Sequence, residues 1–423
     1  MFLSTCLLAL LPGAGSASAL PPVTVADGGK LLFVLMGQSD GNPRGDKPWV
    51  CVWDLTKPEL KAVVSGLPAG TRSIHPTADG KRFVLVGGNR WHVSHVEVWD
   101  VADKKRLREF DVPAKESSIT TVSPDGNWVA FRPLTNKADK AEVRVWNTDT
   151  GKRAGEVAKA ATGIKGELAF STDSKRLIVT SETEYGEYDL TNGKKASGWK
   201  REEPPHLYRE SGGDVAVLPD GKGIVLVSPT AKRRPSYVIL LRTEKKDWHL
   251  GEFWDSASAP ALSPDGRLLI VSGGRPNDGG GTFVLKLDAD GTPEMEDRVE
   301  RDRPLFGGGD GKKVPAWREW QLGEVLRGRF DLKGDWPRSV AFSEDGKRVF
   351  VGGTLGRVHV HDAERREQNA TLFAAEPKKD SLPEWHILTV GGEFVASPAE
   401  TEALTTKGKK KDVAKVKEAL GRR

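Results

Sequence analysis

The stretch Ser263-Pro264-Asp265-Gly266-Arg267-Leu268-Leu269-Ile270-Val271 joins a tight turn to an apolar, β-branched run. Gly accepts a positive φ and Asp bonds to nearby backbone, so the first five residues predict a hairpin turn that leads into a strand. Similar turns recur along the chain, at Ala26-Asp27-Gly28-Gly29-Lys30, Thr77-Ala78-Asp79-Gly80-Lys81, Ser123-Pro124-Asp125-Gly126, Ser171-Thr172-Asp173-Ser174-Lys175, Leu218-Pro219-Asp220-Gly221-Lys222 and Ser343-Glu344-Asp345-Gly346-Lys347.

The spacing of these turns indicates a structural repeat. Their aspartates are 52, 46, 48, 47, 45 and 80 residues apart, and five of the six intervals suit one four-stranded unit each. A second signature follows each turn, after one β-rich run and a variable loop. It is an alternating strand that reads Val52-Trp53-Asp54, Val98-Trp99-Asp100, Val145-Trp146-Asn147, Glu187-Tyr188-Asp189 and Val360-His361-Asp362, with eroded copies at 238–242 and 284–288.

The repeat predicts how these sheets are arranged. A single four-stranded sheet cannot bury both of its faces, whereas sheets stacked around an axis cover one another. We therefore expect an all-β fold, a β-propeller of about seven four-stranded blades, with eight blades as the alternative.

Residues 22–375 resemble the WD40 family, because Trp53-Asp54 and Trp99-Asp100 match its Trp-Asp dipeptide. The Gly-His dipeptide that opens WD40 repeats is missing, so the resemblance does not imply that family's hydrogen-bonded tetrad. The Ser-Pro-Asp-Gly turns are also similar to those of TolB-like and lactonase-like propellers.

The chain divides into four segments on this interpretation. Residues 1–19 are a signal peptide, 20–375 are the propeller, 376–398 are a ring-closing piece or a partial extra hairpin, and 399–423 are a basic tail with helical spacing of its apolar residues. The long interval between turns holds an insertion at 286–338, which is either an excursion from one blade or a degenerate extra blade.

The first segment predicts the compartment. An apolar run at 2–11 precedes Ala17-Ser18-Ala19, which is the order found in a secretory signal with cleavage after Ala19, so we expect a secreted or periplasmic protein. A buried first strand is the alternative. The run is far shorter than the roughly 20 residues of a membrane span, so no stable membrane insertion is expected. Removal of Cys6 would leave Cys51 without a disulfide partner in the chain.

The net charge of +5 is concentrated at the carboxyl end, where 407–423 contain eight basic and two acidic residues. The remaining 406 residues therefore sum to −1. A neutral body with a basic tail gives no reason to expect nucleic acid as the partner.

Histidine pairs are the candidate metal ligands, although no metal or other cofactor is assigned. His359 and His361 alternate on one predicted strand and so share a face, but His361 occupies the Trp position of the repeat, where a packed core histidine is the competing interpretation. His92 and His95 flank a predicted loop, for which a plain solvated loop is the alternative. Gly37 to Gly41 match a nucleophile elbow, yet a loop follows instead of the helix that an elbow needs, so no catalytic residue is assigned.

The variable loops between second and third strands are the candidate binding surface, because a rigid frame commonly carries its function on such loops. They predict a non-catalytic, extracytoplasmic interaction scaffold that binds a protein partner through one face of the propeller. A metal-dependent hydrolytic or lactonase-like enzyme and a carbohydrate-binding propeller are the alternatives. The candidate binding residues are Trp49, Arg90, Trp91, His92, Arg275 and Asn277.

Overall fold

The structure is a computed structural model in which strands dominate. It describes residues 23–37, 47–89, 92–112, 118–133, 143–155, 157, 168–171, 173–180, 184–200, 214–218, 223–229, 236–243, 247–254, 260–273, 281–287, 295–296, 314–315, 317–320, 337–353, 357–365, 367–378 and 382–421. Within these residues no helix is long and apolar enough to cross a bilayer.

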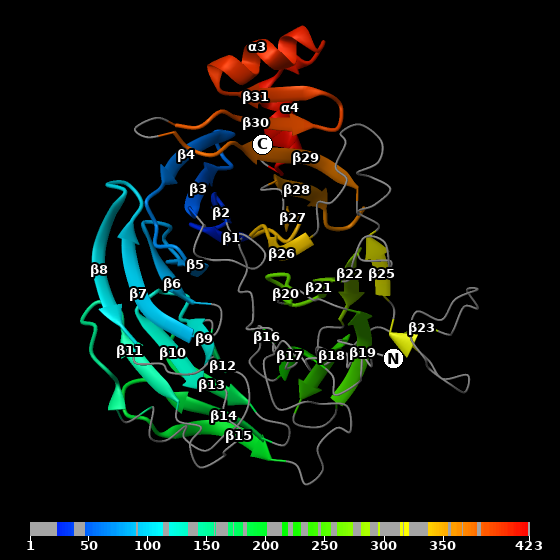
Figure 1. The fold of residues 1–423 in the computed structure, drawn as a ribbon. Helices are drawn as coiled ribbons and strands as arrows, with labels where there is room; N and C mark the ends of the chain where they lie inside the picture. The colour runs from blue at the N-terminus through cyan, green and yellow to red at the C-terminus, as the bar shows by residue number, and fades with distance from the viewer. Residues whose placement is uncertain are drawn as a thin grey trace, which may run out of the picture.

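The strands form antiparallel sheets in which sequence neighbours pair in order, arranged around a centre (Figure 1). The first strand of each sheet is innermost. The sheets consist of β1 (Val23–Ala26), β2 (Leu31–Met36), β3 (Trp49–Asp54) and β4 (Glu59–Val64); β5 (Thr71–Pro76), β6 (Arg82–Asn89), β7 (His92–Asp100) and β8 (Lys105–Asp111); β9 (Ser118–Val122), β10 (Trp128–Pro133) and β11 (Arg144–Asn147); β12 (Leu168–Phe170), β13 (Arg176–Thr180), β14 (Glu184–Asp189) and β15 (Lys195–Lys200); β16 (Asp214–Val217), β17 (Gly223–Pro229), β18 (Ser236–Thr243) and β19 (Asp247–Trp254); β20 (Ala261–Leu262), β21 (Leu268–Gly273), β22 (Gly281–Lys286) and β25 (Trp317–Trp320); and β26 (Pro337–Phe342), β27 (Arg348–Gly353), β28 (Arg357–Asp362) and β29 (Gln368–Ala374). The predicted all-β fold is confirmed. Five of these seven sheets have four strands in the described residues, the β9–β11 sheet has three, and the last sheet continues beyond β29.

The recurring turn between first and second strands has the same hydrogen bonds in five copies, those that begin with Ser or Thr; the first copy has Ala26 at that position. In one copy Ser263 Oγ donates to Asp265 Oδ1 at 2.5 Å and accepts from the backbone N–H of Leu268 at 2.8 Å. The same pair of bonds forms around Thr77, Ser123, Ser171 and Ser343. The hydroxyl residue and the aspartate are therefore required by the turn itself.

Glycine is favoured for two reasons at once at Gly126 and Gly80, although Ser174 adopts a φ of +58° at the same turn position. Gly126 has φ +73°, and a Cβ at this position would lie 2.6 Å from Cγ2 of Thr77 in the preceding sheet. Gly80 has φ +65°, and its Cβ would lie 2.6 Å from Cδ1 of Leu31. The turns of neighbouring sheets consequently approach one another closely around the inner end of the ring.

The hydrophobic core consists of clusters between successive sheets. The aromatic residue of the second signature packs back against the sheet before it. Trp99, for example, stacks on Phe83 at 6.3 Å and joins a cluster that contains Leu31 and Phe33 of the β1–β4 sheet. Burial of these side chains on both faces of each sheet explains why the repeat is stable only as an array.

The predicted insertion lies within one sheet. Its fourth strand is β25, which pairs with β22, and the intervening chain includes a separate two-stranded ladder of β23 (Met295–Glu296) and β24 (Val314–Pro315). The described part of 286–338 therefore extends the connection between the third and fourth strands of that sheet.

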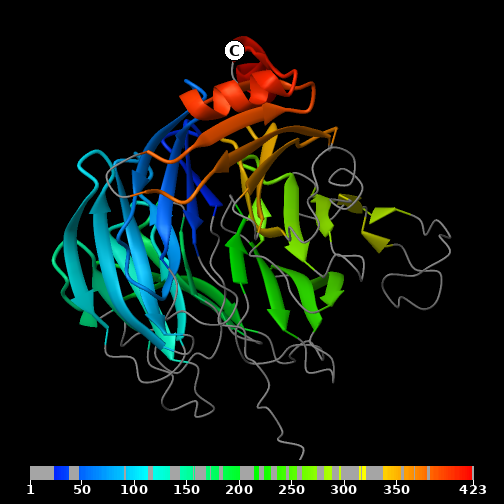
Figure 2. The same cartoon turned by 45° about the horizontal axis from the view of Figure 1, so that its top comes forward.

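The predicted ring-closing piece or extra hairpin at 376–398 lies at the outer edge of the last sheet. There β30 (Trp385–Thr389) pairs with β29 and β31 (Glu393–Ala396) pairs with β30; helix α3 (Pro398–Thr406), the short strand β32 (Lys410–Lys411) and helix α4 (Val413–Ala419) follow. Figure 2 shows this C-terminal extension, residues 382–421, stacked outward from the ring. Its indole at Trp385 meets that of Trp53 in the first sheet at 5.7 Å, edge to face.

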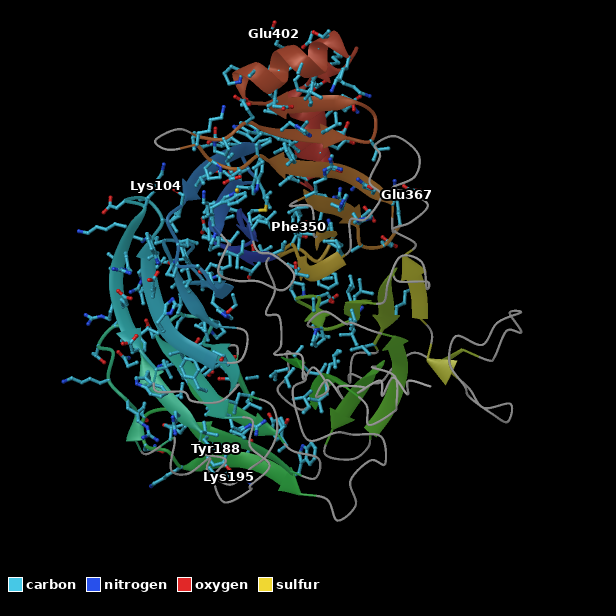
Figure 3. All side chains as sticks on the ribbon, in the orientation of Figure 1. Lys104, Tyr188, Lys195, Phe350, Glu367 and Glu402 are labelled. Carbon is cyan, nitrogen blue, oxygen red and sulfur yellow. The ribbon has the colours of Figure 1, made fainter. Side chains whose placement is uncertain are left out.

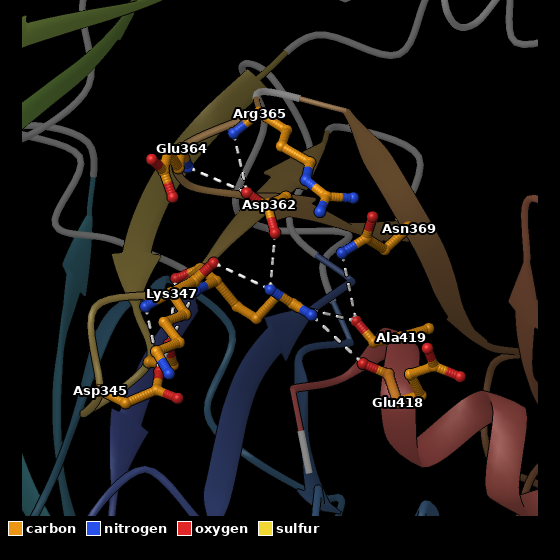
Figure 4. Close-up of polar contacts among 10 residues, drawn as sticks. Asp345, Lys347, Asp362, Glu364, Arg365, Asn369, Glu418 and Ala419 are labelled. Atoms are coloured by element: carbon orange, nitrogen blue, oxygen red, sulfur yellow. Dashed lines mark hydrogen bonds and ion pairs between the residues drawn. The ribbon is translucent and has the colours of Figure 1, made fainter. Parts of the chain in front are cut away.

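Helix α4 docks onto the seam between the first and last sheets. Val416 and Leu420 are buried in one cluster with Trp53 and Phe350. The guanidinium of Arg348 donates to the backbone carbonyls of Ala419 at 3.1 Å and Glu418 at 3.2 Å, so it caps the end of the helix (Figure 4). The basic tail is thus fixed to the ring by both apolar packing and hydrogen bonds.

Figure 3 shows Phe350 within the ring of sheets, whereas Lys104 and Glu402 lie at its outer edge. The seam closes through the inner strands as well, since Gly352 of β27 lies against Val23 of β1, where a Cβ would be 2.4 Å from Val23 Cγ2.

Candidate functional site

The two ends of the ring differ in what they present. Because each sheet runs in the same order with antiparallel neighbours, all connections from second to third strands leave at one end, here called the loop face. The turns from first to second strands and from third to fourth strands lie at the opposite end, here called the turn face.

The predicted binding residues fall mostly outside the described residues of the loop face. Arg90, Trp91, Arg275 and Asn277 all do so, as does the side chain of His92 at the start of β7. Trp49 begins β3 and is half-buried. Its ring packs against the cluster that joins the first and last sheets and covers Gly37, where a Cβ would lie 2.4 Å from Trp49 Cζ3. Trp49 therefore supports the base of its loop.

His359 and His361 share a face of β28, as expected, and both are only 2% exposed. They stand opposite Val351 and Val349 of β27, which belong to the cluster between the last two sheets. Burial, together with the charge of neighbouring His359, lowers the pKa of His361 to about 3, so its imidazole is neutral at physiological pH. The second histidine takes the place that Trp has in other sheets, packed against the preceding sheet.

His95 packs within its own sheet. It pairs across the ladder with Gly87, where a Cβ would lie 2.5 Å from His95 Nε2, so the imidazole occupies the space above that glycine. Across the described residues there is no group of three or more His, Cys, Asp or Glu side chains arranged to hold a metal ion.

On the turn face, hydrogen bonds connect successive first-to-second strand turns into a continuous structure that we call the turn rim. The N–H of Asp27 donates to the carbonyl of Ala78 at 2.8 Å, the N–H of Ala78 donates to the carbonyl of Pro124 at 3.1 Å, and the N–H of Asp125 donates to Ser174 Oγ at 3.0 Å. Four sheets are linked in this way. The turn rim is therefore a rigid border around the inner end of the ring.

Most turn aspartates are occupied by these internal bonds. A hydrogen bond from Thr77 Oγ1 holds the pKa of Asp79 below its usual value, and Ser171 and Ser263 do the same for Asp173 and Asp265. These carboxylates therefore accept hydrogen bonds within their own turns, which is the structural role that the repeat predicts for them.

A cavity of about 460 Å³ opens inside the turn rim. The described residues that line it come from five sheets and include two carboxylates, Asp27 and Glu344, one imidazole, His75, and no lysine or arginine. His75 Nε2 lies 3.1 Å from Ser73 Oγ, and burial lowers the pKa of His75 to about 4, so this ring is neutral at physiological pH. The cavity is thus negatively polarised without a compensating cation in its described lining.

Sequence reasoning missed this cavity. One signal was present: Glu344 occupies the turn position that is proline in Ser123-Pro124-Asp125 and Ser263-Pro264-Asp265. A residue that departs from the repeat at a solvent-facing turn is a candidate for a functional role. The sequence does not show, however, that the closed ring brings Glu344 beside Asp27.

Comparisons with known proteins add a fold likeness alone. No protein-family model matches the chain, and no curated protein sequence matches it. Among solved structures, a chain of Kuenenia stuttgartiensis hydrazine synthase aligns with a TM-score of 0.50 at 17% identity, covering 83% of this chain and 98% of that chain. The successive antiparallel sheets around one centre give this chain the β-propeller fold.

Two further alignments fall just below that TM-score. A chain of the mitotic checkpoint complex aligns at 0.49 with 12% identity, covering 83% of this chain and 89% of that one. The β-propeller domain of Myceliophteria thermophila Cps50 (Swd1) aligns at 0.48 with 12% identity, covering 82% and 98%.

Proposed function

We propose that the protein is a non-catalytic interaction scaffold that binds a protein partner through its loop face. The sheet topology carries this proposal: in each of the seven sheets the second strand ends, and the third strand begins, at the same end of the ring. A rigid frame that gathers one connection from each of seven sheets on a single face is well suited to binding a macromolecule, because the loops can vary without disturbing the core.

We also infer a ring of seven blades and a location outside the cytoplasm. Seven antiparallel sheets of three or more strands occur in the described residues, which supports the blade count. The apolar run at 2–11 and Ala17-Ser18-Ala19 support export. The mass of the amino-terminal peptide of protein recovered from its native cells tests export, and a retained Met1–Ala19 segment would contradict it.

The binding proposal is tested by comparing two variants of the full chain. One variant replaces Arg90, Trp91, Arg275 and Asn277 by Ala on the loop face. The matched control replaces Lys104 and Lys194, exposed in third-to-fourth strand turns of the turn face, by Ala. Cross-linking in the native cells followed by mass spectrometry identifies the partner, and purified partner then gives an affinity for each variant.

We expect the loop-face variant to lose at least tenfold in affinity and the control to retain it, because interface energy is concentrated in a few aromatic and arginine side chains. Unchanged binding by the loop-face variant would reject the proposal. A stoichiometric divalent ion on the untagged protein, removed by a chelator with loss of stability, would favour the metal-dependent enzyme instead.

A further inference from the structure

We propose that the cavity inside the turn rim binds a cationic side chain, the guanidinium of arginine or the ammonium of lysine, presented by a partner segment. This site lies on the face opposite the loop face, so it is a second binding site, independent of the proposed function.

The first observation is the contrast between two neighbouring carboxylates in one turn. Asp345 accepts hydrogen bonds from Ser343 Oγ at 2.6 Å and from the N–H of Lys347 at 3.0 Å, and so belongs to the turn. Glu344 is exposed, lines the cavity, and accepts no hydrogen bond from the described residues. Its carboxylate is therefore available to a ligand.

The second observation is the proximity of a carboxylate from another sheet. Glu344 lies over the turn of the first sheet, where a Cβ on Gly28 would be 2.8 Å from Glu344 Oε2. The adjacent Asp27 is fixed by its N–H bond to Ala78 and by a positive φ of 49°. Lys30 Nζ lies 3.3 Å from Asp27 Oδ1, but this ion pair is exposed and Lys30 does not line the cavity. Two carboxylates thus border one opening, and the cation paired with Asp27 in the described residues is the solvent-exposed Lys30.

The third observation is the character of the remaining wall. Three prolines, Pro76, Pro124 and Pro264, line the cavity together with Val122 and Phe342. Arginine and lysine have apolar stems that pack on such surfaces while their charged ends reach a carboxylate. His75 is neutral at physiological pH and does not repel a cation.

These features distinguish a cationic side chain from other ligands. A phosphate or carboxylate would meet two negative groups and no cation in the described lining of the cavity. An uncharged apolar residue would leave the Glu344 carboxylate without a partner as water is displaced, which is costly. A cation with an apolar stem satisfies both parts of the wall.

The test uses the full chain and two small probes, N-acetyl-arginine methylamide and its citrulline counterpart, which has nearly the same shape without the charge. Binding is measured by NMR titration at low ionic strength for the wild type, E344Q, D27N and E367Q. D27N keeps a residue that tolerates positive φ. E367Q removes an exposed carboxylate from the same sheet outside the described cavity lining, and serves as the matched control.

We expect the arginine probe to bind the wild type and E367Q with equal affinity, and to bind E344Q and D27N about tenfold more weakly. Its affinity for the wild type should fall at high salt. The citrulline probe should bind at least tenfold more weakly than the arginine probe. Equal binding of both probes, an unchanged affinity in E344Q, or no binding of the arginine probe to the wild type would each overturn the proposal. Unchanged melting temperatures show that the variants are folded.

Discussion

The substitution Val416→Ala measures how strongly helix α4 holds the seam between the first and last sheets. Val416 is 0% exposed within the cluster that contains Trp53, Phe350 and Leu420. Val413 lies on the same helix but is 44% exposed, so V413A makes the same chemical change at a solvated position.

The magnitude follows from these two environments. Two buried methyl groups contribute about 1.6 kcal/mol at about 0.8 kcal/mol each, and the cavity left behind raises the loss to about 2.5 kcal/mol. The higher helix propensity of alanine stabilises the folded state of both variants by about 0.5 kcal/mol. We therefore expect V416A to lower the free energy of unfolding by about 2 kcal/mol and V413A to change it by about 0.5 kcal/mol or less.

Urea denaturation followed by circular dichroism gives the free energies, and hydrogen exchange shows where the chain opens. V416A should accelerate exchange in β30 and α4, because Trp385 in β30 packs on Trp53 across the same seam. Equal stability of V416A and V413A would show that the docked helix does not hold the seam, and would refute this account of ring closure.

Two further outcomes are expected. G126A should cost about 3 kcal/mol by urea denaturation, because a Cβ there combines a positive φ with a 2.6 Å approach to Thr77, whereas G66A, with φ +75° and nothing within 4 Å, should cost about 1 kcal/mol. The pKa of His361 is about 3 in the folded protein and near the ordinary 6.5 when unfolded. The contribution of neutral His361 to the free energy of unfolding is therefore fully present above about pH 6.5 and is lost as the pH decreases, so H361F should reduce the loss of stability between pH 7 and 4. Similar losses in both glycine variants, or an unchanged pH profile in H361F, would contradict these assignments.

The repeat could be predicted from the sequence because interactions between residues close together in the chain form it. The bond from Ser263 to Asp265 and the positive φ of Gly266 involve residues within three positions of one another, so the turn is readable wherever the pattern recurs. The aromatic signature was equally readable, because a large ring in an alternating strand must be buried. The sequence also shows that His361 stands at the Trp position of the repeat. A buried, packed side chain is expected at that position for the same reason.

The candidate site was less predictable, because each of its parts looks ordinary in isolation. Asp27 and Glu344 are both turn residues by sequence, and 317 positions separate them. Nothing local indicates that one carboxylate stands free while Asp345 beside it is bound. The same is true of the tail, in which the helical spacing of Val416 and Leu420 was evident but their partners were not.

The sequence by itself determined the unit: a four-stranded antiparallel sheet with a Ser/Thr-x-Asp-Gly turn, repeated until the sheets could bury one another. Only the tertiary structure decided how the ring closes, with α4 and the β30–β31 hairpin at the seam, and which turn residues border a common cavity. The physical reason is that turns are stabilised by hydrogen bonds a few residues apart. Closure and cavity depend on contacts between chain ends, which exist only after all the sheets are in place.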